Sequence, residues 1–228
     1  MKKSVLFVED NAIAQTLIAE VFGSEYQIDI VGDYVAAMEK LSQVQYELVI
    51  TDIFFPQESG SGKKDLAGEL AERIRSFCWR EGTEHFSSLI EYLLGEEKDI
   101  RAYQDEDPEY AFETAQSAAH ELSWPLDRLQ DTIKAINSWL SSQDEADQPL
   151  GILVAEECER RDLRFKMASS LFHHNNKLEA VNQFVNSKKW PDIFDYGHRG
   201  SSGEELENPK ESRIFWEELR KEVMKGSA

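Results

Sequence analysis

The chain has 228 residues, of which 41% are hydrophobic and 11% aromatic, and this composition excludes a chain that is disordered throughout. Asp and Glu number 44 against 25 Lys and Arg, and the resulting net charge of -19 argues against nucleic acid or an anionic membrane as a partner. No apolar run approaches the roughly 18–20 residues that cross a bilayer, and the start lacks the apolar core of a secretory signal. We therefore expect a cytoplasmic protein, in which Cys78 and Cys158 are buried thiols.

The first part of the chain, up to Pro56, alternates strands and helices. The unbroken apolar run at 5–8 is typical of a strand that is covered on both faces. Apolar spacing predicts a helix over 11–22 that buries Ile13 and Ile18, and a second helix that begins after an N-cap at Asp33. The three predicted strands end near residues 8, 31 and 51. Strands separated by helices in so short a segment predict a parallel sheet with right-handed crossovers.

Residues 57–148 follow a different pattern. A Gly/Ser-rich linker at 58–62 precedes apolar residues that recur with a helical period as far as Leu140. No strand pattern occurs, and the segment holds more than half of the chain's net negative charge. We predict an acidic helical insertion of three or four helices.

The last part of the chain, 149–228, returns to alternating helices and strands. Strands are predicted at 164–168 and 190–194, and helices after Pro149, around 178–185 and over 209–225. The last helix is expected to bury Ile214, Phe215, Leu219 and Val223. Residues 1–56 and 149–228 would then form one α/β domain of five parallel strands, interrupted by an all-α insertion after the third strand.

Carboxylates follow two of the predicted strands. Glu9 and Asp10 end the first strand and Asp52 ends the third, and these strands are neighbours where the strand order of an open sheet reverses. Three carboxylates in one place cannot all ionise cheaply without a cation, and Mg²⁺ suits such oxygen ligands. Ser169 ends the fourth strand and could donate to an oxyanion. The sequence therefore predicts a magnesium site at the carboxyl edge, beside the insertion.

Two segments resemble the receiver domain of response regulators. VLFVEDN at 5–11 resembles the opening of that family, and ITDIFFP at 50–56 resembles its phosphoacceptor strand, with proline four residues after the aspartate. The resemblance implies a flavodoxin-like sheet, Asp52 as phosphoryl acceptor, and Glu9, Asp10 and Asp52 around Mg²⁺. It also implies that Ser169 fills the hydroxyl position after strand four. It covers 1–56 and, more weakly, 149–197.

One feature of the family is missing from its expected place. The resemblance implies a lysine at the end of strand five, where this chain has Asp195, and Lys188 and Lys189 precede that strand at its wrong end. We therefore expect conformational coupling that is weak or is routed through the insertion. Other basic residues that could supply the cation are Lys63, Lys64 and Arg199.

Histidines offer two further candidate sites. His173 and His174 follow the fourth strand and could bind a metal, although adjacent side chains usually diverge. The segment AHELSWPL at 119–126 resembles the phosphorylated helix of sensor histidine kinases, in which His120 would carry the phosphoryl group. Nothing in the chain resembles a kinase nucleotide-binding domain.

The leading prediction is a phosphoaspartate signalling module of two-component type, a phosphoacceptor protein rather than a turnover enzyme. Its partners would be a sensor kinase or other phosphodonor and a protein bound through the insertion, with neither nucleic acid nor membrane as a partner. One alternative is a pseudo-receiver scaffold that is not phosphorylated. The other is a phosphotransfer protein that uses His120.

Overall fold

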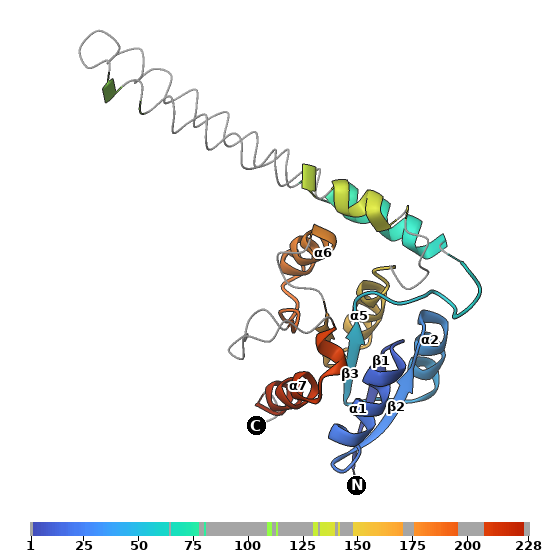
Figure 1. Ribbon diagram of the computed structural model, residues 1–228. Helices are drawn as coiled ribbons and strands as arrows, with labels where there is room; N and C mark the ends of the chain where they lie inside the picture. Colours follow the sequence, from blue (N-terminus) through green and yellow to red (C-terminus); the bar gives the residue numbers. More distant parts are fainter. Residues whose placement is uncertain are drawn as a thin grey trace.

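A computed structural model describes residues 2–63, 65–77, 80, 109–110, 113, 130–131, 133–139, 141, 148–170, 176–195 and 208–225. Strands and helices alternate along the chain, which is an α/β fold of the general flavodoxin-like kind (Figure 1). The strands are β1 (Lys3–Val8), β2 (Tyr26–Val31), β3 (Leu48–Asp52) and β4 (Phe165–Ala168). The helices are α1 (Ala12–Phe22), α2 (Tyr34–Gln43), α5 (Gly151–Arg160), α6 (Asn176–Ser187), the 3-10 turn η3 (Pro209–Glu211) and α7 (Arg213–Lys225).

The strands form a parallel sheet in the order β2-β1-β3-β4. This order confirms that the first and third strands are neighbours, with Val8 opposite Thr51. On the other side of β3, Asp52 is opposite Ala168. The residues that follow β1, β3 and β4 therefore emerge together at the carboxyl edge of the sheet.

The predicted fifth strand is reduced to a single bridge in the part of the chain that the structure describes. Phe194 pairs with Ala168, the Phe194 N–H donates to the carbonyl of Met167 at 2.9 Å, and the Ser169 N–H donates to the carbonyl of Phe194 at 2.9 Å. Pro191 has no N–H with which to extend the ladder. The prediction of a strand over 190–194 was therefore too long, and the described sheet has four strands.

Helices cover both faces of this sheet. Val5 and Phe7 of β1 pack in one cluster with α1 and α7, whereas Leu6 and Val8 pack in another with α2 and α5. Successive side chains of a strand point to opposite faces, so a strand covered on both sides must be apolar at every position. This arrangement confirms the interpretation of the apolar run at 5–8.

Two isoleucines that the helical pattern predicted to be buried are exposed. Ile13 is 53% exposed because α1 turns Ala14 and Ile18 towards the core. The predicted last helix is divided into η3 and α7, and in α7 Ile214 is 58% exposed while Trp216 is buried. A helix turns by about 100° per residue, so Ile214 lies on the side away from the buried stripe.

The described residues of the predicted insertion between 65 and 141 are helical, whereas 57–63 form turns and bends. Residues 65–77 and most of 130–141 form helices whose apolar side chains share a core with α5 and α6. Trp139 lies 6.2 Å from Phe54, ring centroid to centroid, just after Asp52. This contact places the helix that contains Trp139 beside the carboxyl edge. The Gln148 side-chain amide donates to the carbonyl of Lys63 at 3.1 Å, so the two ends of the predicted insertion lie close together.

The division into two domains stays a prediction. None of the described helices has the length and apolarity needed to cross a membrane.

Candidate functional site

Three carboxylates gather at the carboxyl edge of the sheet. Glu9, Asp10 and Asp52 each offer an oxygen within 4.8 Å of the others. Glu9 is buried, and the Asp52 side chain is only 11% exposed. The sheet order explains the cluster, because β1 and β3 are adjacent and end together. The sequence prediction that these side chains meet is confirmed.

A buried lysine completes the cluster. Lys210, on η3, is 2% exposed, and its Nζ lies 2.5 Å from Asp52 Oδ2 and 2.9 Å from Glu9 Oε2. Lys210 was not among the basic residues named as candidates from the sequence. The cation comes from a turn just before the last helix and not from the end of a fifth strand.

The other basic candidates do not supply this cation where the structure describes them. Lys63 forms an exposed ion pair with Glu58. Lys188 lies over the rings of Phe184 and Trp190, at 5.5 and 5.8 Å from their centroids, away from the carboxylates. Lys64 and Arg199 lie outside the described residues.

Burial and charge set the ionisation of this cluster. Burial raises the pKa of Glu9 to about 7; Lys210 opposes that rise and the neighbouring Asp52 adds to it. Burial by itself would lower the pKa of Lys210, but Asp52 and Glu9 together hold it above its ordinary value. Lys210 is therefore a permanent cation at this site, while the charge of Glu9 depends on what else binds there.

The backbone around Asp52 is held from two sides. The Ile53 N–H donates to Asp52 Oδ1 at 2.6 Å. The start of α5 approaches so closely that a Cβ on Gly151 would lie 2.1 Å from the Asp52 carbonyl oxygen. Only glycine fits at this position. The helix was predicted from Pro149 and its apolar residues, although the glycine at its start is also a signal of close approach.

Ser169 also lies at this edge. It directly follows Ala168, the register partner of Asp52, and it is buried. Asp195 is buried after the Phe194 bridge, but it is not in the acidic cluster found among the described residues. His120, His173 and His174 lie outside the described residues, so their predicted roles stay predictions.

The donor set suits a small, hard cation. Three carboxylates and one ammonium leave two negative charges when Glu9 is ionised, which is the charge of one divalent ion. Carboxylate oxygens are the ligands that Mg²⁺ and Ca²⁺ prefer. Glu9, Asp10 and Asp52 could therefore hold a metal ion.

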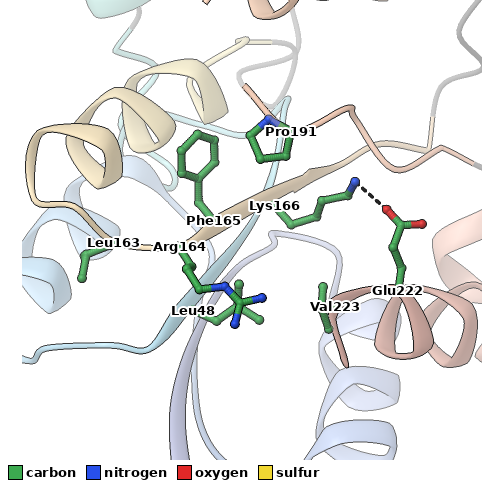
Figure 2. A pocket seen from close by; sticks show the side chains of 8 residues that line it. All are labelled: Leu48, Leu163, Arg164, Phe165, Lys166, Pro191, Glu222 and Val223. Atoms are coloured by element: carbon green, nitrogen blue, oxygen red, sulfur yellow. Dashed lines mark ion pairs between the residues drawn. The ribbon is translucent and has the colours of Figure 1, made fainter. Parts of the chain in front are cut away.

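A hollow lies at the opposite, amino edge of the sheet (Figure 2). It has a volume of about 370 Å³ and lies where β3 and β4 begin. Within it, Lys166 pairs with Glu222 at 2.5 Å. The remaining lining is mainly apolar: Leu48, Leu163, Arg164, Phe165, Pro191 and Val223. This hollow has no cluster of carboxylates among the described residues.

Comparison with protein-family models, with curated proteins and with solved structures finds no match to this chain. The sequence offered no clear signal for Lys210, because it follows Pro209 on a segment that was interpreted as part of one helix over 209–225.

Proposed function

We propose that this chain is a phosphoaspartate signalling module that accepts a phosphoryl group on Asp52. The observation that carries the proposal is the buried Lys210, paired with Asp52 in a cluster that also holds Glu9 and Asp10. The receiver resemblance implies an aspartate, two further acids and a lysine with these roles. Lys210 would take the role of the family's lysine from a different element.

The chemistry follows from these groups. A carboxylate oxygen of Asp52 attacks the phosphorus of a phosphodonor and forms a new P–O bond, while the bond to the leaving group breaks and the leaving group departs with the electron pair. Lys210 would donate N–H groups to the phosphoryl oxygens. Mg²⁺, held by Glu9, Asp10 and Asp52, would offset the charge on those oxygens. Ser169 would donate to a phosphoryl oxygen of the product.

The product would change the charge of the edge. The phosphoryl group brings about 1.5 to 2 negative charges and three acceptor oxygens, and it replaces the single negative charge of the Asp52 carboxylate, so the site becomes more negative by up to about one charge. The site would then contain an excess of negative charge that Lys210 can meet only by turning from Glu9 and Asp52 towards the phosphoryl group. This change is the local electrostatic switch that a signalling protein needs.

The proposal is tested by incubating the protein with acetyl phosphate and Mg²⁺, followed by intact-mass measurement and peptide mapping. We expect one phosphoryl group on Asp52, and none in Asp52→Asn. Asp192→Asn is the matched control, because Asp192 is an exposed aspartate outside the acidic cluster. Labelling of Asp52→Asn at the rate of the wild type would contradict the assignment.

A pseudo-receiver scaffold is the second candidate. It is favoured by the same ion pairs, because Lys210 partly neutralises Glu9 and Asp52 without any bound cation. In that case Asp52 would stay unlabelled, and beryllofluoride with Mg²⁺ would leave the amide spectrum unchanged. Label on His120 would indicate the phosphotransfer alternative.

The cellular setting follows from the same proposal. A sensor kinase or other phosphodonor in the cytoplasm would supply the phosphoryl group, and output would pass through protein contacts made by the segment at 57–148.

A further inference from the structure

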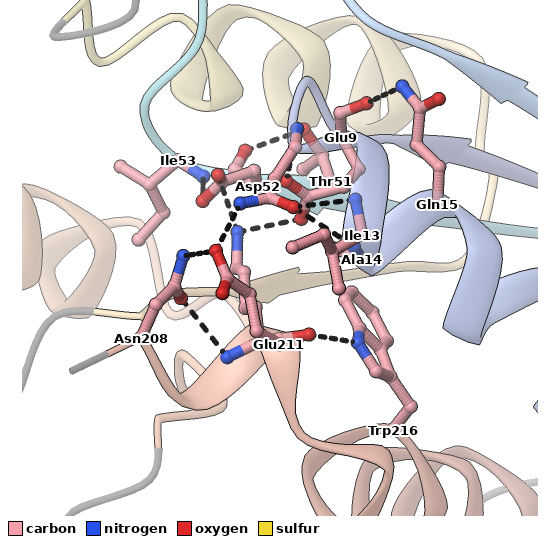
Figure 3. A network of polar contacts seen from close by, with 12 residues as sticks. Glu9, Ile13, Ala14, Gln15, Thr51, Asp52, Ile53, Asn208, Glu211 and Trp216 are labelled. Carbon is pink, nitrogen blue, oxygen red and sulfur yellow. Dashed lines mark hydrogen bonds and ion pairs between the residues drawn. The ribbon is translucent and has the colours of Figure 1, made fainter. Parts of the chain in front are cut away.

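The lysine of this site does not come from a strand end, so other contacts must hold it in place. Lys210 is the middle residue of η3, a 3-10 turn of three residues. The Lys210 N–H donates to the side chain of Asn208 at 3.2 Å. Its carbonyl accepts a buried hydrogen bond of 2.7 Å from the indole N–H of Trp216 in α7 (Figure 3). The first bond caps the turn itself and the second ties it to α7, so neither bond attaches the turn to the sheet.

Asn11 connects the turn that carries Lys210 to the end of β1 and the start of α1. Its Nδ2 donates to Glu211 Oε1 at 2.9 Å, and Glu211 is the residue after Lys210. Its Oδ1 accepts from the N–H groups of Ile13 and Ala14 and so caps α1. Its backbone N–H donates to Glu9 Oε1 at 3.1 Å. One asparagine therefore contacts a site carboxylate, a helix terminus and the turn that carries the lysine.

These contacts form a closed ring. Glu9 accepts from the Asn11 N–H through Oε1 and pairs with Lys210 through Oε2. Lys210 is joined by one peptide bond to Glu211, and Glu211 accepts from the Asn11 amide. Breaking the Asn11–Glu211 bond would leave the turn held by its bond to Trp216 of α7 and by the ion pairs of Lys210, while Glu9, the Asn11 cap and α1 keep their own contacts.

We propose that Asn11 and Glu211 are positioning residues that hold Lys210 against Asp52 and thereby set the rate at which Asp52 gains and loses a phosphoryl group. The proposal rests on the proposed function of Asp52. A further consequence concerns the contact between α1 and the turn before α7. Because Lys210 belongs to the ring of contacts, any movement of Lys210 would also displace this contact, which would therefore respond to the state of Asp52.

The experiment exchanges the donor and the acceptor of the Asn11–Glu211 bond. Asn11→Asp keeps an oxygen that caps α1, since Asp and Asn are about equally good N-caps, but it removes the amide donor and faces Glu211 with a second carboxylate. Glu211→Gln keeps the accepting oxygen and removes only the charge. In the double variant the new carboxylate at 11 accepts from the new amide at 211, and the net charge equals that of the wild type.

Labelling of Asp52 by acetyl phosphate is followed at saturating Mg²⁺ in all four proteins. We expect Asn11→Asp to slow labelling about tenfold, the size expected for loss of one charge-assisted hydrogen bond. Glu211→Gln should stay within about twofold of the wild type, and the double variant should recover most of the rate. Amide exchange should rise in residues 210–212 of Asn11→Asp and stay unchanged within α1.

The outcomes separate this inference from the function on which it rests. Wild-type protein that takes no label overturns the proposed function, and the inference with it. Wild-type protein that is labelled on Asp52, together with an Asn11→Asp variant labelled at the same rate, overturns the inference alone. A double variant as slow as Asn11→Asp would do the same, because the loss would then be an effect of the added acid and not of the broken bond.

Discussion

The two edges of the sheet each hold a lysine that is largely buried, and the two lysines have different surroundings. At the carboxyl edge, Lys210 is 2% exposed and faces Asp52 and Glu9, with Asp10 in the same cluster. At the amino edge, Lys166 is 12% exposed and pairs with Glu222, which is 30% exposed. One cation thus meets three acids at one edge and a single acid at the other.

This difference distinguishes a candidate site from a structural ion pair. A buried charge is tolerated when a partner neutralises it, and the Lys166–Glu222 pair is balanced in this way. The carboxyl edge keeps an excess of acid even with its lysine in place, and burial, to which the charge of Asp52 adds, raises the pKa of Glu9 to about 7. An excess of buried carboxylates indicates that the site binds a further cation or a reversibly attached charged group.

The largest expected effect comes from removing each lysine in turn. Lys210→Met leaves Glu9 and Asp52 buried without their cation, so we expect the free energy of unfolding to fall by about 4 kcal/mol. Lys166→Met leaves Glu222 partly in water, and its loss should be about 1 kcal/mol. Urea unfolding at pH 7 measures both. Equal losses would contradict the contrast between the two edges.

Backbone packing at the carboxyl edge gives the next effect. Gly151→Ala places a Cβ against the Asp52 carbonyl, where only a backbone shift can make room, so we expect a loss of about 3 kcal/mol in the free energy of unfolding. Gly68→Ala is the matched control, because Gly68 lies in a helix with no atom within 4 Å of an added Cβ. That variant should be stabilised by about 0.5 kcal/mol. Thermal unfolding compares the two variants. An unchanged stability of Gly151→Ala would show that α5 does not pack tightly against the Asp52 carbonyl.

Addition of Mg²⁺ should act on one edge only. At a concentration ten times its Kd, Mg²⁺ should raise the free energy of unfolding by about 1.4 kcal/mol. Asp10→Asn removes one of the three carboxylates and should reduce the gain, whereas Glu222→Gln at the amino edge should leave it unchanged. Denaturant unfolding with and without Mg²⁺ makes the measurement. An equal gain in wild type and Asp10→Asn would refute the assignment of Asp10 as a ligand.

The smallest effect concerns a paired acid away from the candidate site. Hydrogen bonds from Arg160 and Arg161 lower the pKa of Glu157 to about 2. A lowered pKa stabilises the fold above the ordinary Glu value of about 4.5, and this stability is lost as the pH falls through about 2. Because these groups are solvated, we expect Glu157→Gln to cost less than about 1 kcal/mol at pH 7 and nothing at pH 2. Urea titrations at the two pH values test this, and a difference that persists at pH 2 would contradict it.

Much of the fold was determined by local sequence. The apolar run at 5–8 is buried on both faces of the sheet, Asp33 caps α2 through its side chain, and the described residues between 65 and 141 are helical. These features depend on residue spacing and on caps that act within a few positions. The exposed Ile13 and Ile214 and the shortened fifth strand could not be predicted in this way, because packing against other elements decides which side of a helix is covered.

The candidate site likewise has features that follow from the sequence and features that depend on tertiary packing. The sequence by itself determined that Glu9, Asp10 and Asp52 meet, since each lies at or just after the end of a strand and parallel strands end at a common edge. Only the tertiary structure decided which cation faces them, because Lys210 reaches Asp52 from a turn far along the chain. That turn is placed by the bonds to Trp216 and Asn11, and the close approach of Gly151 to Asp52 is likewise a contact between distant segments. Residue spacing reports on neighbours along an element, whereas these contacts depend on how separate elements pack.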